Sequence, residues 1–300
     1  MTTLEDYQFD VGGGLVIGRG TLVPVGEVTP GLGAPEMRTA DVDNPTDDGG
    51  FPGVDLFGTR AVTIEAGIRT PDDPAAALDL LARLQQVTGT DATRKTPGAL
   101  AVLRLKWPGR DVKRLYGRWR RVEPATMAQA VYGWIPVNLD FAATDPRWNA
   151  DDSQSLTLPL DISNDDQGFT APVEAPITTG VSNPDERPGW VLNGGDVAAW
   201  PTVRIDGPVT NPKVWVVETG RYLQLQISLA AGEHIDIDTR PGTRWVLKNG
   251  SGNAAPALTS GSRMDLFQIP PGKSEIRWTA TDYTNTCRLT LSWRGAYTAL

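Results

Sequence analysis

Alternating apolar and polar positions recur along the chain and predict short β-strands. In the N-terminal half, strand candidates lie at residues 60–69, 100–105, 114–122 and 134–141, with a pair of short strands within residues 7–28. A period of two places one set of side chains on a buried face and the other set in solvent. We therefore expect this half of the chain to consist mainly of strands joined by turns.

One segment departs from this pattern and predicts a helix over residues 74–88. Asp73 precedes it as a cap, Pro74 occupies a first-turn position, and Gly89 follows as a stop signal. The leucines expected along its buried face are Leu78, Leu81 and Leu84. This pattern predicts one helix packed on a β-sheet.

The last hundred residues show no helical period and contain strand candidates at short, regular intervals. The candidates are residues 202–205, 213–217, 221–229, 234–238, 244–247, 265–269, 274–278 and 287–293. Asn-Gly and Pro-Gly turns separate several of them. Short strands that recur at such spacing are typical of a β-sandwich.

Segments rich in proline, glycine and aspartate predict the domain boundaries. Residues 29–53 form a long loop of this composition, and loops of that length commonly serve in binding or interaction. A second such stretch follows the last strand of the N-terminal half. We expect a first domain at residues 1–152, a linker at residues 153–189 and a second domain at residues 190–300.

The composition excludes several kinds of site. One histidine, His234, and one cysteine, Cys287, cannot build a Cys/His zinc site, an iron–sulfur site or a disulfide. We expect no metal, no cofactor and no catalytic residue, and we expect Cys287 to be a buried or half-buried thiol. The 32 glycines and 24 prolines exceed the usual share and indicate many turns.

Charge and hydropathy argue against two kinds of partner, nucleic acid and membrane. The net charge is −8, which does not favour nucleic-acid binding by the chain as a whole. No apolar run reaches the length of a membrane span, and the first residues lack the basic and apolar regions of a signal peptide. We expect no membrane partner and assembly in a reducing cytoplasm, since there is no disulfide framework.

A basic, aromatic stretch at residues 104–121 is the strongest candidate for an interaction surface. It holds eight basic residues against one acidic residue, interleaved with Trp107, Tyr116 and Trp119. Such a stretch suits a nucleic-acid groove, a solvated strand face or a contact between subunits. In an acidic chain the subunit contact is favoured, with the candidate residues Arg104, Arg110, Arg114, Arg118, Arg120 and Arg121.

The order of these segments resembles a known family. The matching segments are residues 7–20, 49–55, 60–65, 103–110, 118–122, 139–141, 145–148, 200–212, 235–240, 266–272 and 289–294. Together they resemble the distal tail proteins (Dit) of long-tailed, siphovirus-type bacteriophages, among the minor tail proteins of phages of actinobacteria. The resemblance covers nearly the whole chain and depends on the order of segments, because no single motif is diagnostic.

The resemblance implies a mostly β fold and a structural role in the virion. Its first domain would be a tail-tube-like β-sandwich or split barrel with one helix, and its second a galectin-like β-sandwich. The family forms a homohexameric ring at the distal end of the tail. This baseplate ring connects the major tail tube protein to the tail-tip hub, or tail-associated protein. Other implied partners are the tape measure protein and receptor-binding proteins, and DNA crosses the ring only in passage during ejection.

Two other functions remain open from the residues alone. An enzyme would have to use His234, which shares one strand face with Asp236 and Asp238, but a polar, solvent-facing strand face explains this pattern more simply. No nucleophile-elbow or zinc-protease motif is present, so we expect no enzyme. The alternative is a carbohydrate-binding module that contributes to host-surface recognition. It would use some of the second domain's tryptophans, which are otherwise core residues: Trp200, Trp215, Trp245, Trp278 and Trp293.

Overall fold

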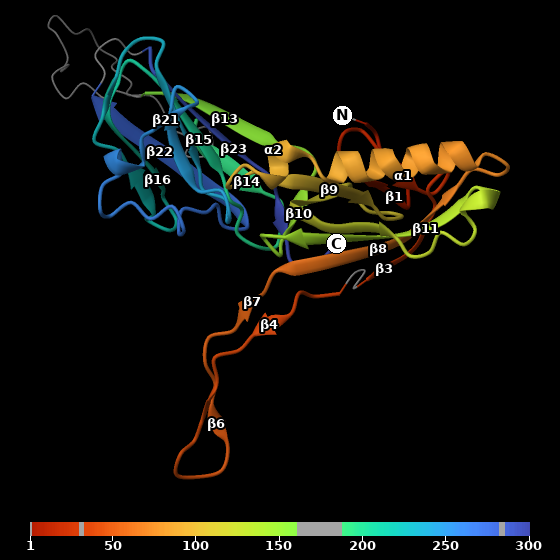
Figure 1. Cartoon of the computed structure of the whole chain (residues 1–300). Helices are drawn as coiled ribbons and strands as arrows, with labels where there is room; N and C mark the ends of the chain where they lie inside the picture. Colours follow the sequence, from red (N-terminus) through yellow and green to blue (C-terminus); the bar gives the residue numbers. More distant parts are fainter. Residues whose placement is uncertain (1, 30–32, 161–187, 282–285) are drawn as a thin grey trace, which may run out of the picture. The chain divides into compact units, whose positions relative to one another are not determined.

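The computed structural model describes residues 2–29, 33–160, 188–281 and 286–300 (Figure 1). These residues form two compact units. The first comprises Met1–Asp152 together with Ala296–Leu300, and the second comprises Ser153–Gly295. Both units are built mainly from antiparallel strands, so the mostly β fold class expected from the sequence is confirmed.

The first unit contains a nine-stranded sheet in which seven strands follow the order β2-β1-β9-β10-β11-β8-β3. Their bounds are β1 Gln8–Asp10, β2 Val16–Gly18, β3 Val25–Thr29, β8 Arg60–Arg69, β9 Ala101–Lys106, β10 Lys113–Pro124 and β11 Trp134–Ala143. Of two further strands, β12 (Trp148–Ala150) pairs with β10, and β24 (Ala296–Tyr297) pairs with β12. Among the described residues the two end strands do not pair, so the sheet does not close into a barrel.

Strict alternation builds the core of this unit. In β11 every second residue is buried, and Val137, Leu139 and Phe141 are at most 1% exposed. The same face of β8 contributes Ile64 and Ile68, which are fully buried. The alternation therefore sets which face of each strand joins the core.

Helix α1 spans Pro74–Thr88, as the sequence predicts, and packs against β8, β10 and β11. The Asp73 carboxylate accepts a hydrogen bond of 2.9 Å from the Ala76 amide, which caps the first turn. The expected buried stripe is partly wrong, because Leu78 is 48% exposed. The buried positions are Ala77, Leu81, Leu84 and Thr88, a spacing of four, three and four residues that follows the helical period.

Short elements complete the first unit. A second helix, α2 (Asp91–Arg94), was not expected from the sequence, and it buries no side chain. A 3₁₀ turn covers Ala130–Tyr132. The predicted long loop, residues 29–53, contains one small hairpin, β5 (Val42–Asp43) with β6 (Gly50–Phe51). It also contains β4 (Met37–Arg38), which pairs with β7 (Leu56–Phe57) just beyond the predicted loop.

The second unit is a sandwich of two sheets. One has the order β13-β23-β15-β19-β20-β21, and the other has the order β14-β22-β16-β17 with β18 beside β16. The bounds in the first sheet are β13 Gln154–Pro159, β15 Thr202–Asp206, β19 His234–Asp238, β20 Trp245–Lys248, β21 Gly252–Asn253 and β23 Arg288–Trp293. In the other sheet they are β14 Trp190–Asn193, β16 Val209–Val216, β17 Tyr222–Gln224, β18 Ser228–Leu229 and β22 Gly272–Thr281. A 3₁₀ turn covers Ala255–Ala257.

Two buried tryptophans link these sheets. The Trp278 Nε1–H of β22 donates 3.0 Å to the Pro159 carbonyl of β13, and the Trp293 Nε1–H of β23 donates 3.0 Å to the Leu192 carbonyl of β14. Both tryptophans are less than 8% exposed. Each indole therefore fills the core and satisfies a carbonyl on the opposite sheet.

The structure differs from two expected domain boundaries and from one predicted strand. Residues 153–160 were assigned to a linker, but β13 pairs along its whole length with β23 and belongs to the sandwich. The chain's last residues return to the first unit, where β24 pairs with β12. Residues 265–269 form no strand and contribute only a bridge between Ile269 and Ala199. The rest of the expected linker lies mostly at residues 161–187, outside the described residues.

Candidate interaction surfaces

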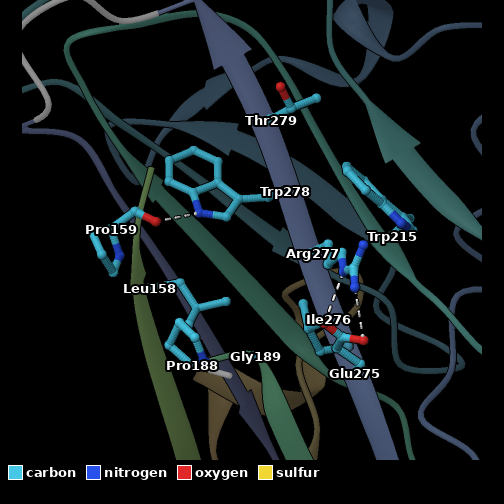
Figure 2. Close-up of a pocket in the computed structure, with 10 residues that line it drawn as sticks. All are labelled: Leu158, Pro159, Pro188, Gly189, Trp215, Glu275, Ile276, Arg277, Trp278 and Thr279. Carbon is cyan, nitrogen blue, oxygen red and sulfur yellow. Dashed lines mark hydrogen bonds and ion pairs between the residues drawn. The ribbon is translucent and has the colours of Figure 1, made fainter. Parts of the chain in front are cut away.

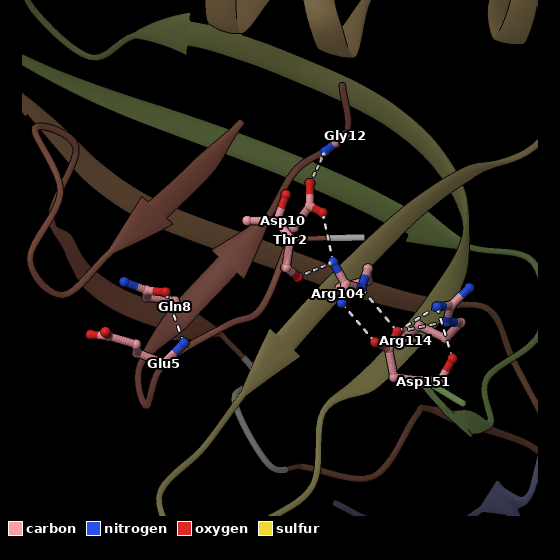
Figure 3. A network of polar contacts seen from close by, with 8 residues as sticks. All are labelled: Thr2, Glu5, Gln8, Asp10, Gly12, Arg104, Arg114 and Asp151. Carbon is pink, nitrogen blue, oxygen red and sulfur yellow. Dashed lines mark hydrogen bonds and ion pairs between the residues drawn. The ribbon is translucent and has the colours of Figure 1, made fainter. Parts of the chain in front are cut away.

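Two of the arginines expected on a contact surface form a buried ionic network (Figure 3). Arg104 donates to the Asp151 carboxylate through Nε at 2.9 Å and Nη2 at 2.6 Å. Its Nη1 donates to Asp10 at 2.9 Å and to the Thr2 carbonyl at 3.1 Å. Arg114 donates to Asp151 through Nε at 3.0 Å and also through Nη2.

Burial and pairing set the protonation of this network. Burial alone would raise the pKa of Asp151, but hydrogen bonds from Arg104 and Arg114 outweigh it and hold that pKa below its ordinary value. The hydrogen bond to Asp151 raises the pKa of Arg104. Arg104 is 7% exposed and Arg114 4% exposed. The assignment of these two arginines to a contact surface is therefore corrected, because both guanidinium groups are buried in the first unit and form ion pairs with its carboxylates.

The other four candidate arginines reach the surface to different degrees. Arg110 is exposed in the turn between β9 and β10. Arg118 is half-buried, and its guanidinium donates to the carbonyls of Ala99 at 3.1 Å and Thr96 at 2.8 Å. This side chain is therefore committed to holding the segment before β9.

A β-bulge exposes the last two candidates. Between Trp119 and Arg121 the register of β10 against β11 shifts, so that Arg120 is the extra residue. Arg120 and Arg121 are both exposed as a result, and Arg121 forms an ion pair with Glu123. The structure thus leaves Arg110, Arg120 and Arg121 as the exposed part of the expected basic surface.

An extended arm occupies most of the segment for which the sequence predicts a long loop with a role in binding or interaction. The arm, residues 33–59, leaves the sheet between β3 and β8 and carries its two hairpins one after the other, away from the sheet (Figure 1). Gly53 passes so close to the Ala40 carbonyl that a Cβ has no room there. An isolated two-stranded hairpin has little stability of its own in water.

The arm exposes large apolar side chains. They are Met37, Val42, Phe51, Val54, Leu56 and Phe57, with exposed fractions from 41% to 72%. A concentration of this kind on a thin projection is costly in water and typically marks a surface that a partner covers. The arm is therefore the strongest candidate for a protein contact.

Arg60 anchors the base of the arm. Its side chain is 2% exposed and donates to the carbonyls of Pro146 at 2.8 Å, Gly33 at 2.6 Å and Thr298 at 3.3 Å. The guanidinium carbon lies 5.0 Å from the centre of the Trp148 ring. Burial lowers the pKa of Arg60. One arginine thus connects the start of the arm to the turn between β11 and β12 and to the C-terminal segment.

The tryptophans of the second unit differ in how deeply they are buried. A groove of about 460 Å³ lies beside β22. In Figure 2, Trp278 lies toward Pro159 on one side of the strand and Trp215 lies on the other side. Trp278 and Trp293 are core residues, whereas Trp215 is half-buried and Trp245 is 37% exposed. The core interpretation therefore holds for the first pair and leaves the second pair available for contacts.

The histidine considered for catalysis lies beside two aspartates of the same strand. His234, Asp236 and Asp238 share one face of β19, as the alternation predicts. The His234 Nε2 lies 3.3 Å from Asp236, and Arg240 holds the fully buried Asp238 at 2.6 Å. Cys287 is buried, as expected.

Within the described ranges, no group of three or more histidine, cysteine, aspartate or glutamate residues is placed to hold a metal ion. In the same ranges, no helix has the length and hydropathy to cross a membrane.

Comparison with known proteins finds one family model that is similar to part of the chain. Residues 194–297 match the family model of the siphovirus-type tail component, C-terminal domain. No curated protein matches the sequence significantly.

Several solved structures share the fold of the whole chain. One is the crystal structure of SPP1 Dit, described as a paradigm of the hub adsorption apparatus of phages that infect Gram-positive bacteria. It has a TM-score of 0.54 and 13% identity over 92% of this chain and 93% of that chain. A second is the structure of the phage P2 baseplate in its activated conformation with Ca. It has a TM-score of 0.55 and 12% identity over 95% of this chain and 97% of that chain. The same baseplate with Sr has a TM-score of 0.55 and 11% identity over 95% of this chain and 96% of that chain. At these identities the similarity establishes a common fold.

Proposed function

We propose that this chain, a siphovirus tail component with the fold of distal tail proteins, is the subunit of a hexameric ring at the distal end of a phage tail. The ring connects the tail tube to the tail-tip hub and provides a platform for receptor-binding proteins. Its role is structural rather than enzymatic. The fold comparison supports this proposal because it spans both units, with more than nine-tenths of each compared chain aligned.

The arm is the observation that carries the proposal of assembly. A ring requires two different surfaces on each subunit, one of which receives the other from the next copy. The six exposed apolar side chains of the arm cannot be buried by the thin hairpins that carry them. Contact with a neighbouring copy would remove this apolar surface from water and would stabilise the hairpins at the same time.

The exposed basic residues supply a second element of the contact. Arg110, Arg120 and Arg121 are exposed in a chain whose net charge is −8, so an acidic surface on the next copy or on the tube protein would complement them. The overall acidity also suits a channel that DNA crosses during ejection. A basic channel would release counterions on contact with DNA and retain it.

The test compares assembly of the full chain with that of two matched double variants. The arm variant carries Phe51→Ser and Phe57→Ser. The control carries Val131→Ser and Tyr132→Ser, which alter exposed apolar residues of the first unit outside the arm. We expect rings from the native chain and the control but mainly monomers from the arm variant, by mass photometry, with unchanged circular dichroism. Rings of undiminished yield from the arm variant would show that the arm does not make the contact.

Charge reversal tests the basic part of the contact separately. The variant Arg120→Glu with Arg121→Glu changes exposed side chains at the bulge and leaves the buried network at Arg104 intact. We expect weaker assembly, with the difference reduced at high salt because exposed charges are screened. Assembly equal to that of the native chain at low salt would remove these arginines from the interface.

A further inference from the structure

A short segment that comes late in the chain belongs to the first unit. Residues 296–300, which we call the strap, are part of that unit although the chain passes through the whole second unit before reaching them. Among the described strands, β24 of the strap pairs only with β12, where Tyr297 lies opposite Trp148. Tyr297 and Leu300 also pack against the core of the first unit. The strap is thus an edge element that few contacts hold in place.

The strap completes the anchor of the arm. The buried Arg60 guanidinium donates to one carbonyl on each of three segments: Gly33 in the arm, Pro146 in the turn before β12, and Thr298 in the strap. All three acceptors are neutral, so these bonds and the Trp148 ring stabilise the buried charge. Without the strap carbonyl, a buried cationic group would lose one of its acceptors, which is costly. The root of the arm therefore depends on the strap.

A buried lysine of β10 contacts the strap as well. The Lys113 Nζ lies 3.3 Å from the centre of the Tyr297 ring, and the lysine is 7% exposed. A cation in this position is stabilised by the ring electrons. Detachment of the strap would uncover Lys113 and would remove an acceptor from Arg60. The docked and the detached strap are therefore two discrete states.

Pairing within the second unit returns the strap to β12. Strand β13 pairs along its whole length with β23, and Gln154 lies opposite Trp293. This pairing joins the two points at which the chain enters and leaves the second unit. It shortens the loop between β12 and β24 about twentyfold, and the probability of closing a flexible loop falls as about the 3/2 power of its length. Pairing of β13 with β23 therefore favours docking of the strap by about a hundredfold over an unfolded second unit.

We propose that the strap is a conformational device that fixes the arm only in a chain whose second unit is folded. With β13 and β23 paired, the strap docks on β12, completes the anchor at Arg60 and fixes the arm in one orientation relative to the sheet of the first unit. With these strands unpaired, the strap detaches and the arm moves about its root.

The consequence for assembly rests on the proposed function, in which the arm makes the contact between subunits. A chain with an incomplete or unfolded second unit would present a loose arm and would lose conformational entropy on joining a ring. The strap would then restrict assembly to chains that have folded throughout. The effect on the arm itself does not require a ring and can be measured in separate chains.

The test measures the arm in the full chain by single-molecule energy transfer between dyes at Val54→Cys in the arm and Glu65→Cys in β8. Both positions are exposed, and the native Cys287 is buried. The protein is kept at picomolar concentration, and only molecules with the brightness of one chain are counted. We expect one narrow distribution of transfer efficiency, because the docked strap fixes the arm.

Two variants break the anchor from its two sides. Deletion of residues 298–300 removes the strap carbonyl, and Arg60→Gln removes the guanidinium. We expect either change to replace the narrow distribution by a broad one, and the two together to broaden it no further, because both remove the same link. The matched control is Arg69→Gln, an exposed arginine at the other end of β8, which should keep the narrow distribution.

A third variant tests the dependence on the second unit. Trp278→Ala removes the indole that donates to the Pro159 carbonyl of β13. At a urea concentration that unfolds its second unit but leaves the amides of β9 and β10 protected from hydrogen exchange, we expect the arm to show the broad distribution. Trp245→Ala, an exposed tryptophan of the same unit, is the matched control and should keep the narrow one.

The opposite results would overturn the proposal. A narrow distribution in Arg60→Gln or in the deletion variant would show that the arm is fixed without the strap. A narrow distribution in Trp278→Ala with its second unit unfolded would remove the dependence on that unit. Arg60→Gln keeps the whole strap, so it tests the anchor even if the deletion alters folding. Ring formation is scored separately by mass photometry, and a native chain with a fixed arm but no rings would contradict the proposed function alone.

Discussion

Replacement of Asp151 by asparagine is expected to destabilise the first unit strongly. Asp151 receives hydrogen bonds from two arginines, with distances of 2.6 to 3.0 Å for three of them. The arginine side chains are 8% and 5% exposed, and that of Asp151 is 14% exposed. Asn has the same shape as Asp but is neutral, and its amide group would face guanidinium donors. Both arginines would then keep their charges in a buried site with one carboxylate fewer.

The expected cost follows from this burial. Removing one partner from a buried, hydrogen-bonded ionic network typically costs about 3–5 kcal/mol. Arg104 keeps its bond to Asp10, so we expect a loss near the lower limit, about 3 kcal/mol. Domains are typically stable by only about 5–15 kcal/mol, so such a loss would be a large fraction of the total.

Hydrogen exchange at neutral pH measures this loss unit by unit. In Asp151→Asn, amides of β9 and β10 should exchange faster by a factor of about a hundred, because about 3 kcal/mol corresponds to that factor. Amides of β16 and β22 in the second unit should not change. The control is Asp91→Asn, which alters exposed ion pairs with Arg94 and Lys95 and should leave exchange unchanged. A change in β9 and β10 no larger than that of the control would refute the ionic network as a source of stability.

Two further predictions concern pH and the sandwich core. The pKa of Asp151 is lower in the folded protein than in the unfolded chain, so its stabilisation is complete above the unfolded pKa of about 4 and is lost as the pH falls through the lower folded value. Thermal unfolding should therefore show the first unit weakening below about pH 4, with a smaller pH dependence in Asp151→Asn; equal dependence would contradict this origin. In the second unit, Trp278→Phe removes the hydrogen bond to the Pro159 carbonyl and should cost about 1 kcal/mol in urea denaturation, plus the loss of ring contacts. A variant as stable as the native chain would show that this bond contributes nothing.

The alternation of apolar residues was sufficient to locate most strands, and the cap residues and leucine spacing were sufficient to locate the helix α1. It correctly placed β8 at residues 60–69 and β19 at residues 234–238, where one face enters the core. It failed at residues 265–269, where an apolar run has only one bridge to Ala199. This bridge pairs Ile269 with Ala199, which is distant in sequence. The local pattern of apolar residues cannot show whether such a distant partner is present.

The fate of the basic stretch could not be predicted because it depends on pairing between distant segments. Arg104 and Arg114 face each other across β9 and β10, and Asp151 reaches them from the residue after β12. The sequence shows the charges but not the register that brings them together. The number of basic residues in the stretch therefore led us to expect a surface where Arg104 and Arg114 form an internal network.

The sequence predicted an interaction loop at residues 29–53 but did not predict the hairpins of the arm, for a different reason. Its proline, glycine and aspartate residues are typical of a loop, and its hairpins have strands of only two residues. Such strands are too short to show a period. The apolar residues Phe51 and Phe57 were the available signal, since large apolar side chains in a polar loop commonly indicate a contact.

The oligomeric state of the full chain tests the central claim most directly. We would measure the mass of the purified protein by mass photometry and image the same sample by negative-stain electron microscopy, alone and with the tail tube protein. The account expects rings with six-fold symmetry and a mass of six chains. A protein that stays monomeric at all concentrations, also in the presence of the tube protein, would contradict it.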